Sequence, residues 1–471
     1  MISFTKIIKK KNKFQLYLLN MSIFSKVIEI YEEYFICTHC LGRMFSLLGS
    51  NTTNQYRGDS LLLSITMENH RNYLNHDKNQ SNSIKNLKIL AEKAHSTTAQ
   101  KVLENEGLNY KKPEINPTCY LCNDIFLDLQ KYVNEAISKV KEYEFNSFLV
   151  GTEIDSQIVN KEDIFKAKLN LLHAESFKSH FNREIGKLLL KLLHKPPDFA
   201  NPDITIVFSL KFKSFNINFL IRSLFIYGRY NKFVRNIPQT HWNCRICNGK
   251  GCQICKFSGK QYMTSVEELM SPEFIKQSYS TKSKFHGAGR EDIDAKMLGE
   301  GRPFILELKN PKIRTLNLEK IQQKVNKKNK RKIKISELRY TNKNQVKIIK
   351  ANAEKVRKLY RVLVKTGKNF TKLEFERFIT KLKIELENQI IKQKTPLRVS
   401  HRRANKIRNK KIYKIEGKYL KPQSFEFLIE TQGGTYIKEL ISGDEDRTNP
   451  SFTQIFEDSL ICKELDVLKI F

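Results

Sequence analysis

Four Cys-x-x-Cys pairs constrain the fold of this chain more than any other feature of its sequence. The pairs are Cys37/Cys40, Cys119/Cys122, Cys244/Cys247 and Cys252/Cys255, and the ninth cysteine, Cys462, stands apart. Because the sequence shows no secretory signal, paired spacing of this kind indicates metal thiolates rather than disulfides. We therefore expect the paired cysteines to be metal ligands.

The first two pairs can complete one zinc site although they are far apart in the sequence. A structural Zn²⁺ takes four ligands in a tetrahedron, and each pair supplies two thiolates. Such a site would tie residues 22–130 into one module, where periodic apolar residues predict helices over 22–36 and 84–106. The Asn-rich sequence over 69–86 is expected to form an exposed loop or a weak helix. Two unrelated redox or free cysteine pairs are the alternative.

The last two pairs lie within twelve residues, in a glycine-rich insert over 242–260. Four thiols at this spacing can wrap one Zn²⁺, and the glycines ease the tight four-residue spacer between the pairs. The alternative is a cysteine-rich turn that binds no metal, or one that needs ligands from outside. We expect structural zinc at both clusters.

The charge of the chain is strongly one-sided. Its 471 residues, enough for roughly three domains, carry 84 Lys and Arg against 49 Asp and Glu, a net charge of +35. Such a field favours polyanions, meaning nucleic acid or an anionic membrane surface. No apolar run reaches the roughly 18 residues of a membrane span. The basic start and the apolar run at 14–19 imitate a signal peptide but are too short for one, and Met21 offers an alternative start.

An AT-rich genome would also enrich lysine and asparagine. We expect RNA binding to be the stronger cause of the charge, because basic residues also fill the best-defined motifs, and we expect a cytoplasmic protein without membrane contact.

A glycine-rich stretch over 285–299 contains the sequence Gly289-Arg290-Glu291-Asp292. Glycines let the backbone reach positive φ and approach a ligand closely. An arginine two residues before an aspartate can hold a phosphate while the carboxylate faces a base or a sugar. Taken alone, four such residues are about as often a glycine-rich turn with solvated charges.

This stretch, extended through Gly301-Arg302-Pro303-Phe304, resembles the Gly-Arg-(Thr/Glu)-Asp loop of pseudouridine synthases. In particular it resembles the archaeal and eukaryotic tRNA pseudouridine synthases that modify uridines 54 and 55 of the T arm. The resemblance implies that Asp292 is the nucleophile, with Asp294 as its nearby rival. Archaeal members carry an insert similar to 242–260, which indicates an archaeal source.

Segments 358–364, 391–404 and 433–444 resemble further motifs of the same family. The resemblance implies that Tyr360 stacks on the target uracil and that Tyr436 and Leu440 line its pocket. It implies that Arg290 orients the RNA backbone. It also implies that Lys438 is the ion-pair partner that keeps Asp292 ionised in a partly desolvated site.

We predict an α+β fold in which a zinc-bound helical module and a THUMP-like α/β domain precede a pseudouridine synthase domain. That last domain should be α+β, with a mixed, largely antiparallel sheet. The expected ranges are 22–130 for the helical module, 131–241 for the THUMP-like region, 242–260 for the Cys-rich insert and 261–471 for the catalytic domain.

Within 131–241, strand-like runs at 147–151 and 204–209 flank a helix at 174–187. This order resembles a THUMP domain, a tRNA-binding module. Basic and aromatic residues of this region suit contact with RNA backbone and bases. They are Lys178, Arg183, Lys187, Arg229, Tyr230, Lys232 and Arg235.

The expected function is the isomerisation of uridine to pseudouridine in the tRNA T arm, at position 55 and also at 54, by base flipping. We expect a monomer with tRNA as its partner. The alternative is a non-catalytic zinc-containing RNA-binding protein, which would give no reason for Asp292 beside Tyr360 and Lys438. A THUMP-bearing thiolase or methyltransferase would need a nucleotide-binding loop, and the sequence has neither a P-loop nor a Gly-x-Gly-x-x-Gly after a strand. No organic cofactor is therefore expected.

Overall fold

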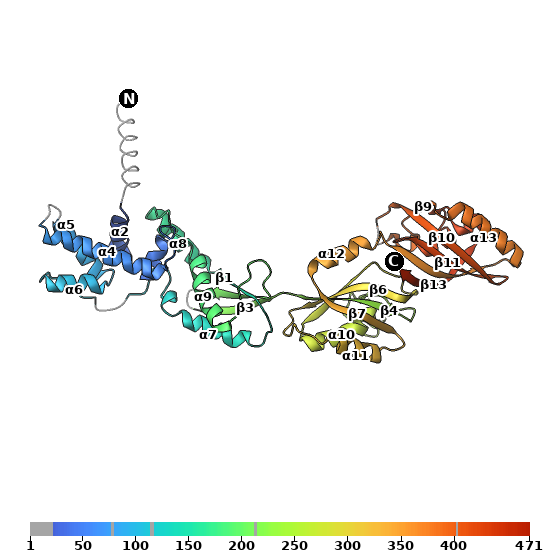
Figure 1. Cartoon of the computed structure of the whole chain (residues 1–471), viewed down its shortest axis with the longest axis horizontal. Helices are drawn as coiled ribbons and strands as arrows, with labels where there is room; N and C mark the ends of the chain where they lie inside the picture. The colour runs from blue at the N-terminus through green and yellow to red at the C-terminus, as the bar shows by residue number, and fades with distance from the viewer. Residues whose placement is uncertain (1–21, 77–79, 114–116, 212–213, 402–403) are drawn as a thin grey trace, which may run out of the picture. The chain divides into compact units, whose positions relative to one another are not determined.

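The structure is a computed structural model that describes residues 22–76, 80–113, 117–211, 214–401 and 404–471. The chain divides into two compact units, residues 1–220 and 221–471, and Figure 1 colours their described residues from blue to green and from green to red. The signal-like start, Met21 and residues 402–403 of the basic motif lie outside the described residues. Over the described residues, none of the helices is long and apolar enough to cross a membrane.

The first part of the first unit is helical. Its helices are α2 (Ile23–Glu33), α3 (Thr38–Met44), α4 (Asn54–Leu74), α5 (Gln80–Glu92) and α6 (Thr97–Asn105). The helix predicted over 22–36 is confirmed, and the Ser22 side chain caps it by accepting a hydrogen bond from the Ser25 amide.

One local prediction for this part was wrong. The helix predicted over 84–106 is broken, because the Ser96 side chain caps a new helix by accepting from the Ala99 amide. Over 69–86, where an exposed loop or a weak helix was expected, the structure has helix at 69–74 and at 80–86. Asn69 is buried and donates to the Ile65 carbonyl at 2.8 Å, so its amide is satisfied inside a helix rather than by solvent.

The second part of the first unit is a small α/β layer structure. Its elements are η1 (Ile125–Leu127), α7 (Leu129–Val140), β1 (Phe148–Ile154), α8 (Ser156–Lys168), α9 (Phe177–Leu193), β2 (Ile204–Leu210) and β3 (Phe215–Ile221). The sheet order is β1-β2-β3, with β1 and β2 parallel, and α9 packs on β1. The predicted strands at 147–151 and 204–209 and the predicted helix at 174–187 are confirmed within a few residues.

The described strands of the second unit form one ten-stranded sheet. They are β4 (Leu224–Lys232), β5 (Lys282–Gly287), β6 (Lys296–Lys309), β7 (Ile333–Thr341), β8 (Arg357–Thr366), β9 (Ile390–Lys394), β10 (Ile407–Lys421), β11 (Ser424–Gln432), β12 (Thr448–Asn449) and β13 (Leu460–Ile470). Their order is β12-β9-β10-β11-β8-β13-β6-β4-β7, with β5 paired to β6. The described pairs are antiparallel except β13 with β6, which confirms the predicted mixed, largely antiparallel sheet.

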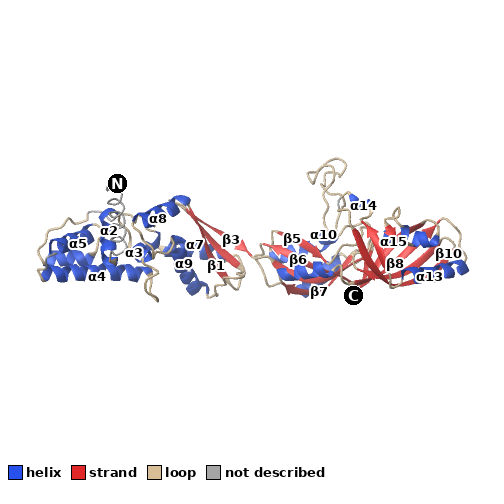
Figure 2. Cartoon of the chain, turned by 90° about the horizontal axis from the view of Figure 1, so that it is seen from above, coloured by secondary structure: helices blue, strands red, loops and turns tan. Residues whose placement is uncertain are grey.

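Helices cover this sheet and enclose its core. They are α10 (Val266–Ser278), α11 (Leu318–Lys328), α12 (Lys343–Asn352), α13 (Lys372–Leu386), α14 (Leu397–Ser400), α15 (Ile437–Ser442) and α16 (Phe452–Phe456). Figure 2 shows α10 beside β5 and β6, and α13 beside β10. Buried side chains such as Phe304, Val362 and Phe427 join both halves of the sheet into one apolar core.

The strand β4 belongs to the second unit, although its residues fall inside the range 131–241. It pairs with β6 and β7 through most of its length. Its residues Tyr230 and Lys232 are therefore fully buried, and the expectation that they contact RNA was wrong. Arg235, which follows β4, is also engaged, since it donates to Glu464 and to the Leu465 carbonyl.

Candidate active site

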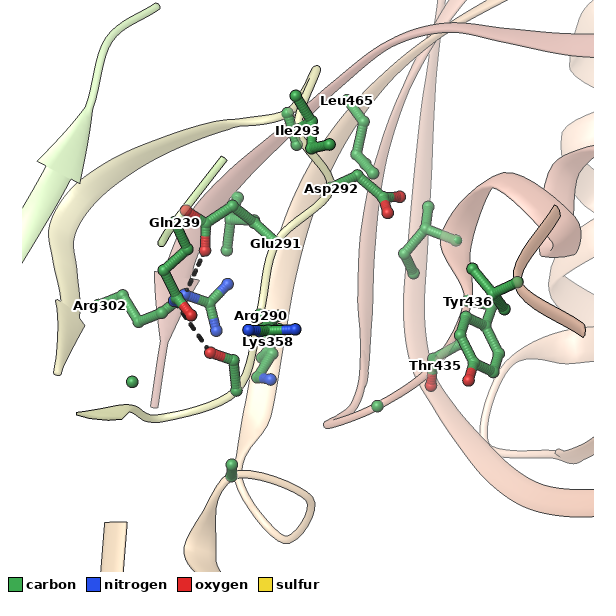
Figure 3. Close-up of a pocket in the computed structure, with 18 of the residues that line it drawn as sticks. Gln239, Arg290, Glu291, Asp292, Ile293, Arg302, Lys358, Thr435, Tyr436 and Leu465 are labelled. Atoms are coloured by element: carbon green, nitrogen blue, oxygen red, sulfur yellow. Dashed lines mark hydrogen bonds and ion pairs between the residues drawn. The ribbon is translucent and has the colours of Figure 1, made fainter. Parts of the chain in front are cut away.

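A pocket of about 830 Å³ opens in the second unit where the loop after β5 faces β8 and the start of α15. Four of the predicted site residues line it: Arg290, Asp292, Tyr360 and Tyr436. Figure 3 shows Arg302 and Lys358 on one side, Thr435 and Tyr436 on the other, and the Asp292 carboxylate directed into the space between them. The pocket thus gathers residues that are far apart in the sequence.

Asp292 is held by an arginine that sequence reasoning did not select. Arg398, in α14, donates from Nη1 to Oδ1 at 2.8 Å and from Nη2 to Oδ2 at 3.1 Å. Its Nε donates to the buried Glu439 at 2.6 Å. Although burial opposes the charge, Glu439 and Asp292 together raise the pKa of the Arg398 guanidinium above its ordinary value. A permanent cation therefore faces the Asp292 carboxylate and fixes its orientation.

The expected pairing of Lys438 with Asp292 was wrong. Lys438 Nζ donates instead to Asp294, at 2.8 Å and 2.6 Å. Burial alone would raise the pKa of Asp294, but the Lys438 ammonium more than offsets this and lowers it. Because Asp292 and Asp294 are two residues apart in a loop, motif order alone could not tell which carboxylate faces α15.

Leu440 does not line the pocket, contrary to expectation. It is 0% exposed and packs in the apolar core with its neighbour Ile441. The pocket's leucine is Leu465, on β13, with Val467 two residues further along the same strand face. The alternation of apolar residues over 465–467 is the sequence signal that could have identified this wall.

The loop that presents Asp292 is anchored by buried charges. Glu291 accepts hydrogen bonds from Tyr230 Oη at 2.8 Å and forms an ion pair with Arg302 at 2.9 Å. Arg302 also donates to the Ala288 carbonyl at 2.9 Å. The buried Lys232 donates to the carbonyls of Ile293 and, at 3.3 Å, Asp292. Both faces of the loop are thus fixed, so Asp292 is preorganised rather than free.

The aromatic residues of the pocket are also held in place. Tyr360 is 7% exposed, and its burial raises the pKa of its phenol to about 12. It therefore stays protonated at neutral pH and offers a ring face rather than a base. Tyr436 is positioned through its backbone, since Gln393 both accepts from its amide at 2.9 Å and donates to its carbonyl at 3.0 Å.

Basic residues dominate the charged lining of the pocket. Seven Lys or Arg side chains contribute to it: Arg290, Arg302, Lys350, Lys358, Arg398, Arg408 and Lys410. The acidic lining residues are Glu291, Asp292, Asp294 and Glu354. A pocket of this charge suits a polyanion that brings one reactive group to a single fixed carboxylate.

The paired cysteines form two four-sulfur clusters. Cys37, Cys40, Cys119 and Cys122 form one, Cys244, Cys247, Cys252 and Cys255 the other, and the sulfurs of each lie within 4.8 Å of one another. Specific Sγ–Sγ distances are 3.7 Å for Cys37–Cys122 and 3.8 Å for Cys247–Cys255. A ZnS₄ tetrahedron with bonds of about 2.3 Å has edges of about 3.8 Å, whereas a disulfide is about 2.05 Å long. Both clusters therefore fit a tetrahedral metal ion.

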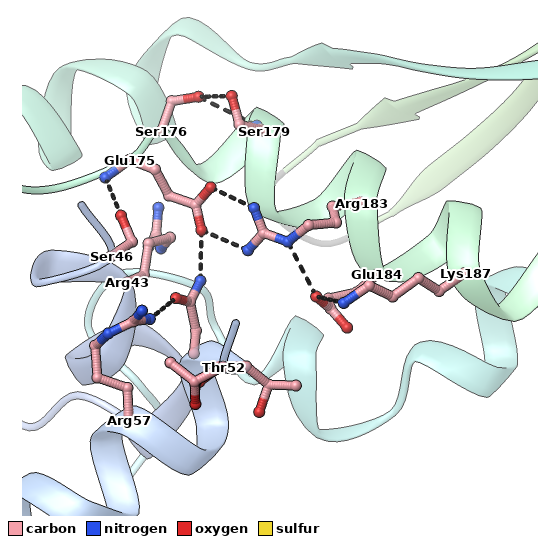
Figure 4. Close-up of polar contacts among 12 residues, drawn as sticks. Arg43, Ser46, Thr52, Arg57, Glu175, Ser176, Ser179, Arg183, Glu184 and Lys187 are labelled. Atoms are coloured by element: carbon pink, nitrogen blue, oxygen red, sulfur yellow. Dashed lines mark hydrogen bonds and ion pairs between the residues drawn. The ribbon is translucent and has the colours of Figure 1, made fainter. Parts of the chain in front are cut away.

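Polar contacts link the first cluster to the α/β part of its unit. Arg43, fully buried, donates to Cys40 Sγ at 3.4 Å and pairs with Glu162 of α8. Figure 4 shows a second group of polar contacts, in which the Glu175 carboxylate accepts hydrogen bonds from Nη1 and Nη2 of Arg183 and from the side-chain amide of Asn54. Arg183, expected to contact RNA, is thus held by a carboxylate within its own unit.

Comparison with known proteins agrees with this architecture. A family profile described as "Pus10, C-terminal" matches residues 225–470, and one described as "Pus10 THUMP domain, archaeal" matches residues 132–209.

Curated proteins named tRNA pseudouridine synthase Pus10 match almost the whole chain. That of Methanocaldococcus jannaschii is 41% identical over 453 residues, covering 96% of this chain and 95% of that protein. That of Methanothrix thermoacetophila is 34% identical, covering 92% and 91%. That of Pyrococcus furiosus is 32% identical, covering 95% and 98%. The family predicted from the loop motifs is confirmed: the chain belongs to the Pus10 family and is an enzyme of the isomerase class, a pseudouridine synthase.

Proposed function

We propose that the chain converts uridine to pseudouridine in the T arm of tRNA, at position 55 and also at 54, with Asp292 as the nucleophile. One observation carries this proposal: the Asp292 carboxylate points into the pocket and accepts hydrogen bonds from Arg398 at both of its oxygens. The names of the relatives support tRNA as the substrate. Work on tRNA would place the enzyme in the cytoplasm, and we propose that it acts as a monomer.

The reaction needs a nucleotide that has left the base stack. A pocket of about 830 Å³ can hold one nucleotide, whereas a paired base would be out of reach of Asp292. We infer that the uracil stacks on Tyr360, with Leu465 and Tyr436 closing its other sides. Arg290, exposed beside the pocket mouth, would hold the RNA backbone.

The isomerisation itself requires no other reactant. The N1–C1′ bond breaks, the uracil turns, and C5 bonds to C1′. The proton that leaves C5 is balanced by the one that N1 takes up, so substrate and product contain the same atoms. Asp292 acts on the nucleoside as the nucleophile, and Arg398 holds both of its carboxylate oxygens and so fixes its orientation.

We infer that both cysteine clusters hold zinc in a structural role. Each offers four sulfurs and leaves no open position for a substrate, which is the arrangement of structural sites. The first cluster would stabilise the helical module that, with the THUMP domain, docks the tRNA. The second would brace the loop that leads from β4 to α10.

Single-turnover pseudouridylation of an unmodified tRNA transcript, with the product position mapped, tests the proposal. Wild type should form product in the T arm, and Asp292→Asn and Asp292→Ala should form none while their tRNA affinity stays within about tenfold. Asp294→Asn is the matched control, because it changes a carboxylate two residues away and should retain measurable turnover. Product outside the T arm would contradict the substrate, and turnover by both Asp292 variants would contradict the nucleophile.

A further inference from the structure

Lys358 lies in the wall of the pocket, and none of the residues that the structure describes is its partner. It stands on β8 two residues before Tyr360, so both side chains leave the same face of the strand. Only 5% of Lys358 is exposed, and it lines the pocket. Among the described residues, none forms a hydrogen bond or an ion pair with its ammonium group. Lysines are rarely buried unless paired, because an ammonium ion loses much of its hydration there.

Two cations and two carboxylates face Lys358. Burial and the neighbouring cations Arg302 and Lys410 lower the pKa of Lys358 to about 7. The carboxylates Glu291 and Glu354 attract its proton but offset only part of this effect. Glu291 is already paired with Arg302, so it is not available as a full counter-charge. The group that would satisfy Lys358 is therefore an anion that arrives with the substrate.

Two glycines keep this corner of the pocket open. Gly289 has φ +80°, and a Cβ there would lie 3.5 Å from Lys358 Nζ. Gly434 has φ +83°, and a Cβ there would lie 3.1 Å from Lys410 Nζ. Both glycines line the pocket, and the missing side chains leave space beside each ammonium group. Figure 3 shows Lys358 near Arg290 on the side of the pocket opposite Tyr436.

We propose that Lys358, assisted by Lys410, binds one backbone phosphate of the RNA next to the target uridine. Two residues along a strand span roughly 7 Å, which suits a phosphate whose own base stacks on Tyr360. A phosphate oxygen would give the Lys358 ammonium the charge-assisted hydrogen bond that the folded chain does not provide. The identity of the anion rests on the proposed function.

Site-specific removal of phosphate charge tests this inference. The tRNA is prepared with one neutral methylphosphonate linkage, either 5′ or 3′ of uridine 55, and binding is measured by fluorescence anisotropy. All proteins carry Asp292→Asn so that no turnover accompanies binding. In this background the test variants are Lys358→Met and Lys358→Gln. Lys350→Met, which removes an exposed lysine of the same pocket, is the matched control.

One of the two methylphosphonates should weaken binding about tenfold when Lys358 is present and leave the affinity of both Lys358 variants nearly unchanged. With Lys350→Met the same linkage should still cost about tenfold. The inference is overturned if, at both linkages, the loss of affinity caused by the methylphosphonate simply adds to the loss caused by the Lys358 substitution. That result would place Lys358 against another part of the nucleotide. Failure of the proposed function would appear separately, as an absence of pseudouridine from wild type on unmodified tRNA.

Discussion

Replacing the buried Lys358 by methionine should stabilise the second unit, and the gain should depend on pH. A fall of the lysine pKa from 10.5 to about 7 means that the charged form is disfavoured in the folded chain. Since each tenfold change in a protonation equilibrium corresponds to about 1.4 kcal/mol, the penalty is about 4 to 5 kcal/mol. Relaxation around the ion reduces this figure, so we expect Lys358→Met to add about 2 to 4 kcal/mol to the free energy of unfolding near pH 6.5.

The sign of the pH dependence follows from proton binding. Below pH 7 both folded and unfolded chains carry the Lys358 proton, so the penalty is complete. Between pH 7 and about 10.4 the unfolded chain holds a proton that the folded chain lacks, so wild-type stability rises with pH. The advantage of Lys358→Met should therefore shrink to about 1 kcal/mol near pH 9.5.

The single tryptophan makes the free energy of unfolding of the second unit measurable in the intact chain. Trp242 lines the pocket, so its fluorescence reports the unfolding of the second unit. Urea titrations at several pH values give the free energies, with unchanged slopes as the check that the same unit unfolds. Lys350→Met, which removes an exposed lysine, should change little. A destabilised Lys358→Met, or a gain that is the same at every pH, would refute the reasoning.

Other outcomes follow from the same contacts. Arg398→Lys keeps a charge but cannot grip Asp292 and Glu439 together, so the single-turnover rate should fall about 10²-fold with little change in tRNA affinity; an unchanged rate would exclude Arg398. Glu291→Gln leaves Arg302 buried beside a neutral group and should lower the free energy of unfolding by about 3 kcal/mol, seen in Trp242 fluorescence. Cys37→Ser should reduce bound zinc and melt the first unit in circular dichroism while Trp242 unfolding is unchanged; equal zinc content would contradict this. Raising salt from roughly 50 to roughly 200 mM should weaken tRNA binding by about 10² or more, whereas a flat response would mean that phosphates contribute little.

Local sequence patterns predicted the elements whose own residues determine them. The strands β1 and β2 carry β-branched and aromatic residues, and each overlaps the strand predicted from this pattern, at 147–151 and at 204–209. The break at Ser96 and the buried Asn69 were missed, because each depends on one hydrogen bond rather than on periodicity. The assignment of β4 failed for a different reason. Its apolar run is continuous with β3, and only its pairing with β6 shows which sheet it joins.

The candidate site shows the same contrast between residues that local motifs predicted and contacts between residues far apart in the sequence. Motif order brought Arg290, Asp292, Tyr360 and Tyr436 together, and all of them line the pocket. Arg398 is separated from Asp292 by 106 positions, and nothing in its local sequence marks it as the partner. The pairing of Lys438 with Asp294 depends on which way a loop turns, and that turn is fixed by the buried contacts of Glu291 rather than by its neighbours in sequence.

The two cysteine clusters differ greatly in the length of chain that they close. In the first, Cys37 meets Cys122 across 85 positions, whereas Cys247 meets Cys255 across 8. In a chain-entropy description, tying such loops removes about 4.5 kcal/mol of unfolded-state freedom in the first case and about 2.5 kcal/mol in the second. The second cluster can therefore form locally, as soon as its short segment leaves the ribosome. The first cluster joins residues 85 positions apart, so loss of its metal would restore more unfolded-state freedom and should destabilise the first unit more than loss of the second metal destabilises the second unit.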